Sequence, residues 1–145
     1  MKEFIKKNAL YAAFAMALMS TLGSLFYSEI LNLPPCVLCW YQRIVMYPLI
    51  LIIGYSIYKR SREVLWPALV MIPIGWLIAL YHNLLYFNIL PESAAPCIAG
   101  VSCTTRMPGW LSTFPIPLQA FVGFSIMLVL IIIIWRTSKE TQAND

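Results

Sequence analysis

Hydrophobic residues in this chain form long continuous runs, and polar residues are concentrated between them. Four runs reach the roughly 20 residues that a helix needs to cross a lipid bilayer. They cover about residues 9–28, 40–58, 64–90 and 116–135. The strands of a membrane β-barrel would be shorter and would alternate in polarity. The pattern therefore predicts an all-α membrane protein, with residues 1–145 forming a single four-helix transmembrane domain.

The composition also indicates that the chain is surrounded by lipid. Of its 145 residues, 61% are hydrophobic and 11% are charged, whereas soluble domains carry about 25% charged residues. The first run follows a basic segment, as the core of a signal peptide does. Its length exceeds the roughly 7–15 residues of such a core. We therefore expect it to be retained as a membrane span.

Positive charges predict how the helices are oriented. The net charge is +4, and most Lys and Arg residues precede the first run, separate the second from the third, or follow the fourth: Lys2, Lys6, Lys7, Lys59, Arg60, Arg62, Arg136 and Lys139. Loops rich in Lys and Arg stay in the cytoplasm. We therefore expect both termini to be cytoplasmic and two loops, about 29–39 and 91–115, to be extracytoplasmic. Because orientation accounts for the basic charge, we expect no nucleic-acid partner.

The four cysteines all lie in these two outer loops, as the pairs Cys36–Cys39 and Cys97–Cys103 in sequence. Thiols outside the cytoplasm tend to be oxidised. A bridge across only two residues removes little chain entropy, so it stabilises weakly and is easily reduced. The first pair therefore indicates redox chemistry. Two structural disulfides, or a zinc site with four thiolate ligands, are the structural alternatives.

Arg43 lies one helical turn beyond the first cysteine pair. Residues of a helix are about 100° apart around its axis, so Cys36, Cys39 and Arg43 fall on nearly one face. A charge within a span is costly and usually functional, although an arginine this near the end can extend to the headgroups. A closed zinc site would leave Arg43 without a role, so we expect no metal.

Two further features of the sequence bear on the chemistry. Cys36 should lie near the start of a helix, where free backbone N–H groups favour a thiolate. His82 lies late in the third run. It is either a packing residue or a group that binds a polar ring or transfers protons.

The segment from Cys36 to Arg43 reads CVLCWYQR. With four spans and a second outer cysteine pair, it resembles the DsbB-type disulfide-bond formation proteins, which are membrane thiol–disulfide oxidoreductases. The pattern CWYQR…MYP and the short second pair are similar to the BdbC branch of Gram-positive bacteria. The resemblance implies an oxidase in the cell membrane that re-oxidises an extracytoplasmic thioredoxin-like disulfide donor. It also implies transfer of the electrons to a membrane quinone, menaquinone in preference to ubiquinone.

The resemblance also implies a role for each cysteine. Cys97 would be attacked by the partner, and Cys103 would resolve the mixed disulfide and could pair transiently with Cys36. Cys36 and Cys39 would form the disulfide nearest the quinone, with Cys39 contacting the ring. Five residues separate Cys97 from Cys103, far fewer than in the best-known members.

Two residues outside the cysteine pairs also match the family by position. Arg43 corresponds to the arginine that binds the quinone, and His82 lies near the histidine at the outer end of the third span. The resemblance therefore implies that both residues contribute to quinone binding.

Three other functions share part of this pattern. A membrane reductase would need a further dithiol on the cytoplasmic side or within the membrane, and the sequence has neither. An enzyme like vitamin K epoxide reductase also combines four spans, a Cys-x-x-Cys pair and quinone chemistry, but its pair lies near the outer end of a late span. A non-catalytic membrane adaptor with structural disulfides would keep all four cysteines locked under mild reductant.

Overall fold

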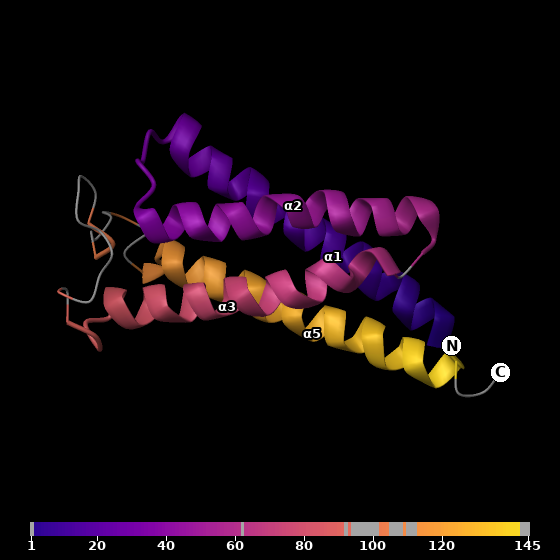
Figure 1. Cartoon of the computed structure of the whole chain (residues 1–145). Helices are drawn as coiled ribbons and strands as arrows, with labels where there is room; N and C mark the ends of the chain where they lie inside the picture. Colours follow the sequence, from indigo (N-terminus) through magenta and orange to yellow (C-terminus); the bar gives the residue numbers. More distant parts are fainter. Residues whose placement is uncertain are drawn as a thin grey trace.

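The computed structural model describes residues 2–61, 63–91, 93, 102–104, 109 and 113–142. The described chain is helical and contains no strand. Each of its four long helices is long and apolar enough to cross a membrane, which confirms the predicted fold class. These helices, shown in Figure 1, are α1 (Lys2–Leu25), α2 (Val37–Lys59), α3 (Trp66–Tyr86) and α5 (Ile116–Gln142). The two short elements are the π-helix η1 (Phe26–Ile30) and the 3₁₀-helix η2 (Glu63–Leu65).

Two helix boundaries differ by a few residues from those that the apolar runs predict, because local backbone geometry determines where each helix starts or ends. Helix α2 begins at Val37, three residues before the expected start of the second span, because Cys36 caps its first turn. Helix α3 ends at Tyr86, whereas the third apolar run extends to residue 90. The chain turns at Asn88, whose φ of 56° lies in the left-handed region. Asparagine enters this region more readily than most residues do.

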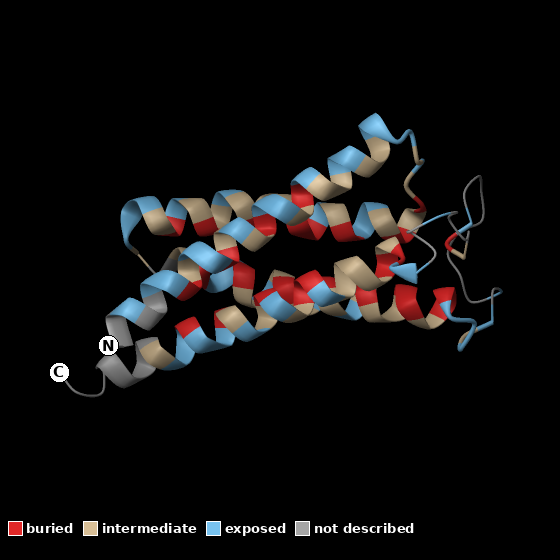
Figure 2. Ribbon diagram, turned by 180° about the vertical axis from the view of Figure 1, so that it is seen from behind, coloured by how far each residue is buried: buried red, intermediate tan, exposed pale blue. Residues whose placement is uncertain are grey.

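The four long helices form a closed ring in which α1, α2, α3 and α5 each pack against the next, and α5 packs back against α1. Figure 2 shows that buried positions are concentrated where the helices meet. On α1 the core positions are alanines four residues apart, Ala9, Ala13 and Ala17. Small residues at this spacing let helix backbones approach closely. The other helices supply larger core side chains, including Leu49, Ile53, Ile72, Phe124 and Met127.

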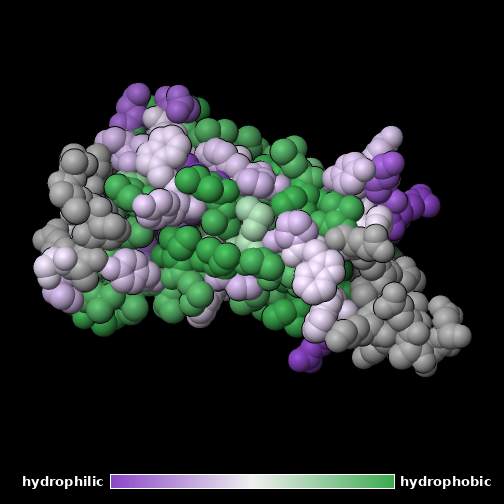
Figure 3. Space-filling model, in the orientation of Figure 1, coloured by the Kyte–Doolittle hydropathy of each residue, from purple (hydrophilic) through white to green (hydrophobic). Residues whose placement is uncertain are grey.

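The outside of the bundle is apolar. Large hydrophobic side chains such as Leu51 and Met19 are exposed, with 75% and 69% of their surface accessible. Figure 3 shows hydrophobic residues over much of the middle of the visible face. In water such a surface would be strongly unfavourable, whereas lipid tails solvate it. The structure therefore supports a multi-pass membrane protein.

Both chain termini lie at one end of the bundle, and the start of α2 lies at the other end (Figure 1). The first cysteine pair is at this start, because Cys36 is the N-cap of α2. At that second end, hydrogen bonds join the helices. Asn83 on α3 donates its amide to the carbonyl of Pro117 on α5 at 2.8 Å. The Tyr27 hydroxyl, beyond α1, donates to Oε1 of Gln119 on α5 at 2.8 Å. These contacts fix the helix ends around the cysteines. Which end faces the cytoplasm stays a prediction from the charges.

The closest approach of α3 and α5 depends on Gly75. A methyl group added at Gly75 would run into the ring of Phe124, which is itself buried. We expect Gly75→Ala to destabilise the bundle by about 1–3 kcal/mol, the usual cost of overpacking a core. The measurement is thermal unfolding of the purified protein in detergent, followed by circular dichroism.

Gly23→Ala on α1 is the matched control, because no heavy atom lies within 4 Å of the added methyl group. We expect this variant to unfold at or slightly above the wild-type temperature, since alanine favours helix. Equal unfolding temperatures for the two variants would contradict the described packing.

Candidate active site

The first cysteine pair lies at the start of α2. Pro34 and Pro35 precede it and are not helical, and helix formation begins directly after Cys36. The backbone N–H of Cys39 donates to Cys36 Sγ at 3.4 Å, so a sulfur atom caps the helix. The two Sγ atoms are 3.0 Å apart, and both residues are free thiols. This geometry brings the two sulfurs close enough to form a disulfide after modest movement.

The surroundings of Cys36 favour its thiolate. Its pKa falls from 9.0 to about 4, chiefly because of the hydrogen bond with the Cys39 side chain. Burial opposes this shift, while a hydrogen bond with His82 and the charge of that ring lower the pKa further. The thiolate is the reactive form in thiol–disulfide exchange. Cys36 is therefore suited to exchange chemistry near neutral pH.

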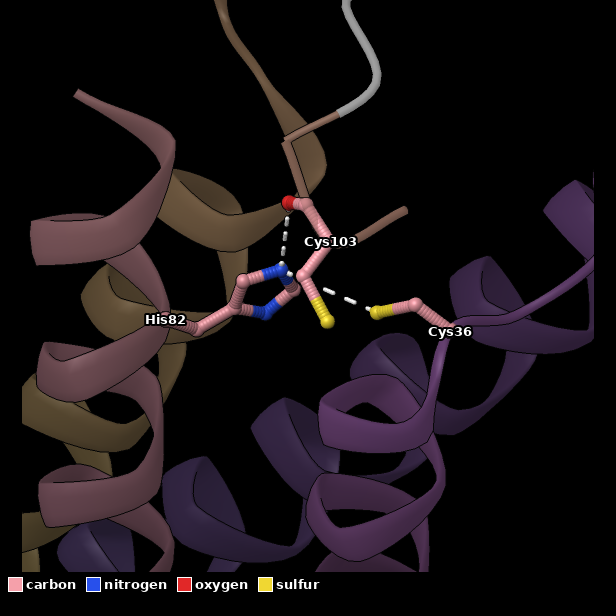
Figure 4. Close-up of side chains that lie close together, drawn as sticks. All are labelled: Cys36, His82 and Cys103. Atoms are coloured by element: carbon pink, nitrogen blue, oxygen red, sulfur yellow. Dashed lines mark hydrogen bonds between the residues drawn. The ribbon is translucent and has the colours of Figure 1, made fainter. Parts of the chain in front are cut away.

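His82 joins the first cysteine pair to the second loop. It lies on α3 with only 2% of its surface exposed. Its Nε2 lies 3.8 Å from Cys36 Sγ and 3.3 Å from the backbone oxygen of Cys103 (Figure 4). Its Nδ1 lies 3.5 Å from the amide nitrogen of Gln42 on α2. His82 is therefore a buried residue in contact with a cysteine, and its role in binding a ring or transferring protons stays a prediction.

Cys103 lies directly over the start of α2. It is 4% exposed and is disulfide-bonded. Its Sγ, Cys36 Sγ and a ring nitrogen of His82 all lie within 4.8 Å of one another. Figure 4 shows the sulfurs of Cys103 and Cys36 directed toward each other. Cys97, the other cysteine predicted in this loop, lies outside the described residues.

Arg43 is held against α1. Its Nη2 donates to the backbone oxygen of Ser24 at 3.0 Å. Its guanidinium carbon lies 5.4 Å from the centroid of the Trp40 ring, within the range of a cation–π contact. The guanidinium group is therefore held between α1 and α2 by these two contacts.

A cavity of about 380 Å³ lies beside these residues. Its volume falls within the range of about 300–1,000 Å³ that is common for small-molecule sites. Most of its lining is apolar and includes Met16, Met19, Met46, Phe114 and Phe124. Its polar wall carries every predicted site residue that the structure describes: Cys36, Cys39, Arg43, His82 and Cys103.

Residues that the sequence did not single out also contribute to this site. Gln42 lies against His82, Ser24 holds Arg43, and the pair of Tyr27 and Gln119 closes the cavity between α1 and α5. The sequence offers a signal for Gln42, which is a polar residue within an apolar run, one helical turn beyond Cys39. The other partners depend on how the helices are rotated and packed.

The family model described as "Disulfide bond formation protein DsbB" matches residues 6–135. This chain belongs to the DsbB family. The family description indicates a protein of disulfide bond formation, and therefore an oxidoreductase. No solved structure matches the chain.

Several relatives are similar over nearly their whole length. A "Probable disulfide formation protein" of Oceanobacillus iheyensis is 40% identical, with 94% of this chain and 96% of the relative covered. "Disulfide bond formation protein C" of Bacillus subtilis is 37% identical, with 90% and 95% covered. A further "Probable disulfide formation protein", from Metapseudomonas resinovorans, is 38% identical, with 89% and 90% covered. The family therefore includes close matches from several bacterial genera.

The low pKa of Cys36 predicts how its alkylation depends on pH. In the reduced protein, we expect the rate of Cys36 alkylation to be nearly constant above pH 5 and to fall by half at about pH 4. Below that pH the thiolate becomes protonated and loses its reactivity. The rate is measured by mass spectrometry of the peptide that contains Cys36, after short treatment with iodoacetamide.

Cys39→Ala is the matched variant, because it removes the hydrogen bond that lowers the pKa most. We expect its midpoint to move to higher pH. An ordinary thiol midpoint in both proteins would contradict the described environment of Cys36.

Proposed function

We propose that this chain is an oxidase of the cell membrane that re-oxidises an extracytoplasmic thioredoxin-like disulfide donor and passes the electrons to a membrane quinone. The observation that supports this proposal most directly is that Cys36 Sγ lies within 4.8 Å of Cys103 Sγ on one side. On the other side, Cys36 and Cys39 line a largely apolar cavity together with Arg43. Cys103, the first cysteine pair and the cavity thus follow one another in space.

The first step exchanges disulfides with the partner. One partner thiolate attacks Cys97 of a Cys97–Cys103 disulfide and forms a mixed disulfide, so that Cys103 leaves as a thiolate. The partner's second thiolate, in place of Cys103, then resolves the mixed disulfide: it attacks the partner sulfur bound to Cys97 and releases Cys97 as a thiolate. The partner is now oxidised, and Cys97 and Cys103 hold its two electrons.

The second step moves these electrons to the first pair. The Cys103 thiolate attacks Cys36 of a Cys36–Cys39 disulfide, which forms a Cys36–Cys103 bond and releases the Cys39 thiolate. Cys97 then attacks Cys103 and releases Cys36. The described cysteines match the product of this step, because Cys36 and Cys39 are free and Cys103 is disulfide-bonded. The short distance between Cys36 and Cys103 supports this exchange without a large loop movement.

The cavity fits a quinone ring in both size and chemistry. When bound, a quinone would accept the two electrons and two protons that Cys36 and Cys39 lose as they close to a disulfide. Arg43 is always protonated and would hold a polar ring oxygen in this low-dielectric wall, where a fixed charge acts strongly. His82 lies 3.8 Å from Cys36 Sγ and would hold this sulfur beside the ring. As this chain resembles Gram-positive relatives, we propose menaquinone in preference to ubiquinone.

The test of this function is the thiol state of Cys36 and Cys39 in membranes from a host that makes no quinone. We expect both thiols to accumulate in the reduced form and to be oxidised when menaquinone is supplied. Thiol trapping followed by mass spectrometry measures each cysteine. A non-catalytic adaptor would instead show locked disulfides in both membranes, and a thiol state independent of quinone would refute the proposal.

Arg43→Ala separates the two halves of the reaction. We expect quinone-dependent oxidation of Cys36 and Cys39 to slow by about 100-fold, as when one stabilising donor is lost from an enzyme site. Exchange with the partner should keep its rate. Arg136→Ala, which removes an exposed cation from the opposite end of α5, is the control for charge. Equal loss of both half-reactions in Arg43→Ala would contradict this division of roles.

A further inference from the structure

We propose that the fully reduced site captures a thiophilic divalent cation such as Zn²⁺ or Cd²⁺ through Cys36, His82 and Cys103, with Cys39 as a fourth ligand. This inference goes beyond the proposed oxidase function and does not require a quinone or a partner protein. It concerns only the thiol form of the chain, because a disulfide sulfur is not a thiolate ligand. The resting oxidised protein is expected to hold no metal.

The ligand atoms already lie close to the separations that a tetrahedral site requires. With Zn–S near 2.3 Å and Zn–N near 2.0 Å, neighbouring ligands in a tetrahedron are about 3.5–3.8 Å apart. Cys36 Sγ lies 3.0 Å from Cys39 Sγ and 3.8 Å from His82 Nε2. The Sγ atom of Cys103 lies within 4.8 Å of the ligand atoms of Cys36 and His82. Side-chain shifts of about 1 Å would bring Cys36, His82 and Cys103 to these separations. Cys39 Sγ lies outside the group of atoms within 4.8 Å of one another and would have to turn toward the ion.

The ligands are held by different parts of the fold. Cys36 and Cys39 lie at the start of α2, His82 lies on α3, and Cys103 lies in the second loop. Each helical ligand is fixed by its own helix, so little conformational freedom is lost on binding. Such preorganisation raises affinity, because less ordering remains to be done when the ligand arrives.

Gln42 supplies the outer support that metal-bound histidines usually have. Such histidines bind the metal with one ring nitrogen and donate from the other to a neighbouring oxygen. Nδ1 of His82 faces the Gln42 side-chain amide at 3.5 Å. With the amide turned to present its oxygen, Gln42 accepts from Nδ1–H and leaves Nε2 free to bind the metal. Cys36 Sγ lies 3.8 Å from this same Nε2.

The cavity lies next to the proposed ligands. Cys36, His82 and Cys103 are nearly fully buried, but all three line the cavity of about 380 Å³ beside them. The ligand atoms therefore border a cavity and are not sealed within packed side chains. Binding replaces the protons of the thiols, which pass to solvent, and transfers no electrons. While the thiolates coordinate a metal they cannot close to a disulfide, so capture would halt the chain in its reduced form.

Cadmium titration of the purified protein in detergent tests this site. The protein is reduced with a phosphine, freed of reductant without oxygen, and titrated with Cd²⁺. We expect one bound Cd²⁺ per chain by elemental analysis, together with an ultraviolet thiolate-to-cadmium charge-transfer band. Protein with both cysteine pairs oxidised should show neither. Absence of binding by the reduced protein, or equal binding by the oxidised protein, would overturn the proposal.

Single substitutions identify the ligands. We expect Cys36→Ser, Cys39→Ser and His82→Asn each to weaken Cd²⁺ binding by at least about tenfold, since losing even an outer-shell partner costs about 10–100-fold. Cys103→Ser should weaken Cd²⁺ binding by a similar factor, because it removes a member of the three-residue cluster. Ser102→Ala, beside Cys103 but without a ligand atom in the cluster, is the control and should bind as the wild type.

Circular dichroism of each variant checks that it is folded before its affinity is compared. An unchanged affinity in a folded His82→Asn variant would show that the dithiol alone binds, and would overturn the mixed sulfur–nitrogen site. Because the measurement uses no quinone, its outcome is independent of the proposed oxidase function.

Discussion

A sulfur atom caps the first turn of α2, and the rest of the site is built around this contact. The N–H of Cys39 donates to Cys36 Sγ at 3.4 Å, which ties the start of the helix to the reactive thiol. Free N–H groups and the positive end of the helix dipole stabilise negative charge there. The contact also fixes the second sulfur, because Cys39 lies one turn further along the same helix. Helix formation and thiol activation therefore depend on the same atoms.

The location of this cap at the end of a membrane helix determines what surrounds it. Lipid covers the outer surface of the bundle, so polar groups near the site must find partners inside the protein. His82 contacts Cys36, Gln42 and the Cys103 carbonyl, and Arg43 donates to the Ser24 carbonyl. The cavity beside these contacts is mostly apolar, and the same residues form part of its polar lining. Such a cavity suits a lipid-soluble ring with polar oxygens better than a water-soluble substrate.

Much of the fold could be predicted from the sequence, because the number of membrane spans follows from length and hydrophobicity alone. The four long helices confirm that prediction. The end of α3 differs from the apolar run because Ile89 and Leu90 are hydrophobic yet follow the turn at Asn88. Hydrophobicity does not distinguish a helix from an apolar turn at the same membrane depth.

The site was only partly predictable, for a different physical reason. The alignment of Cys36, Cys39 and Arg43 follows from helical periodicity within one segment. The contact of Cys36 with Cys103 depends on how a loop folds over a helix end. The contact of His82 with Gln42 depends on the rotation of α3 relative to α2, and helices that are apolar on every side carry no pattern that fixes this rotation. The sequence therefore named the reactive residues but could not place them against one another.

The central claim is that Cys36 and Cys103 lie close enough to exchange disulfides without rearrangement of the bundle. The most direct measurement uses a chain with Cys39→Ser and Cys97→Ser, in which these two are the remaining cysteines. After mild oxidation with diamide, peptide mapping under non-reducing conditions detects a bond between them. The account predicts a Cys36–Cys103 disulfide within single chains in most molecules. Two free thiols, or a bond formed only between two chains, would contradict it.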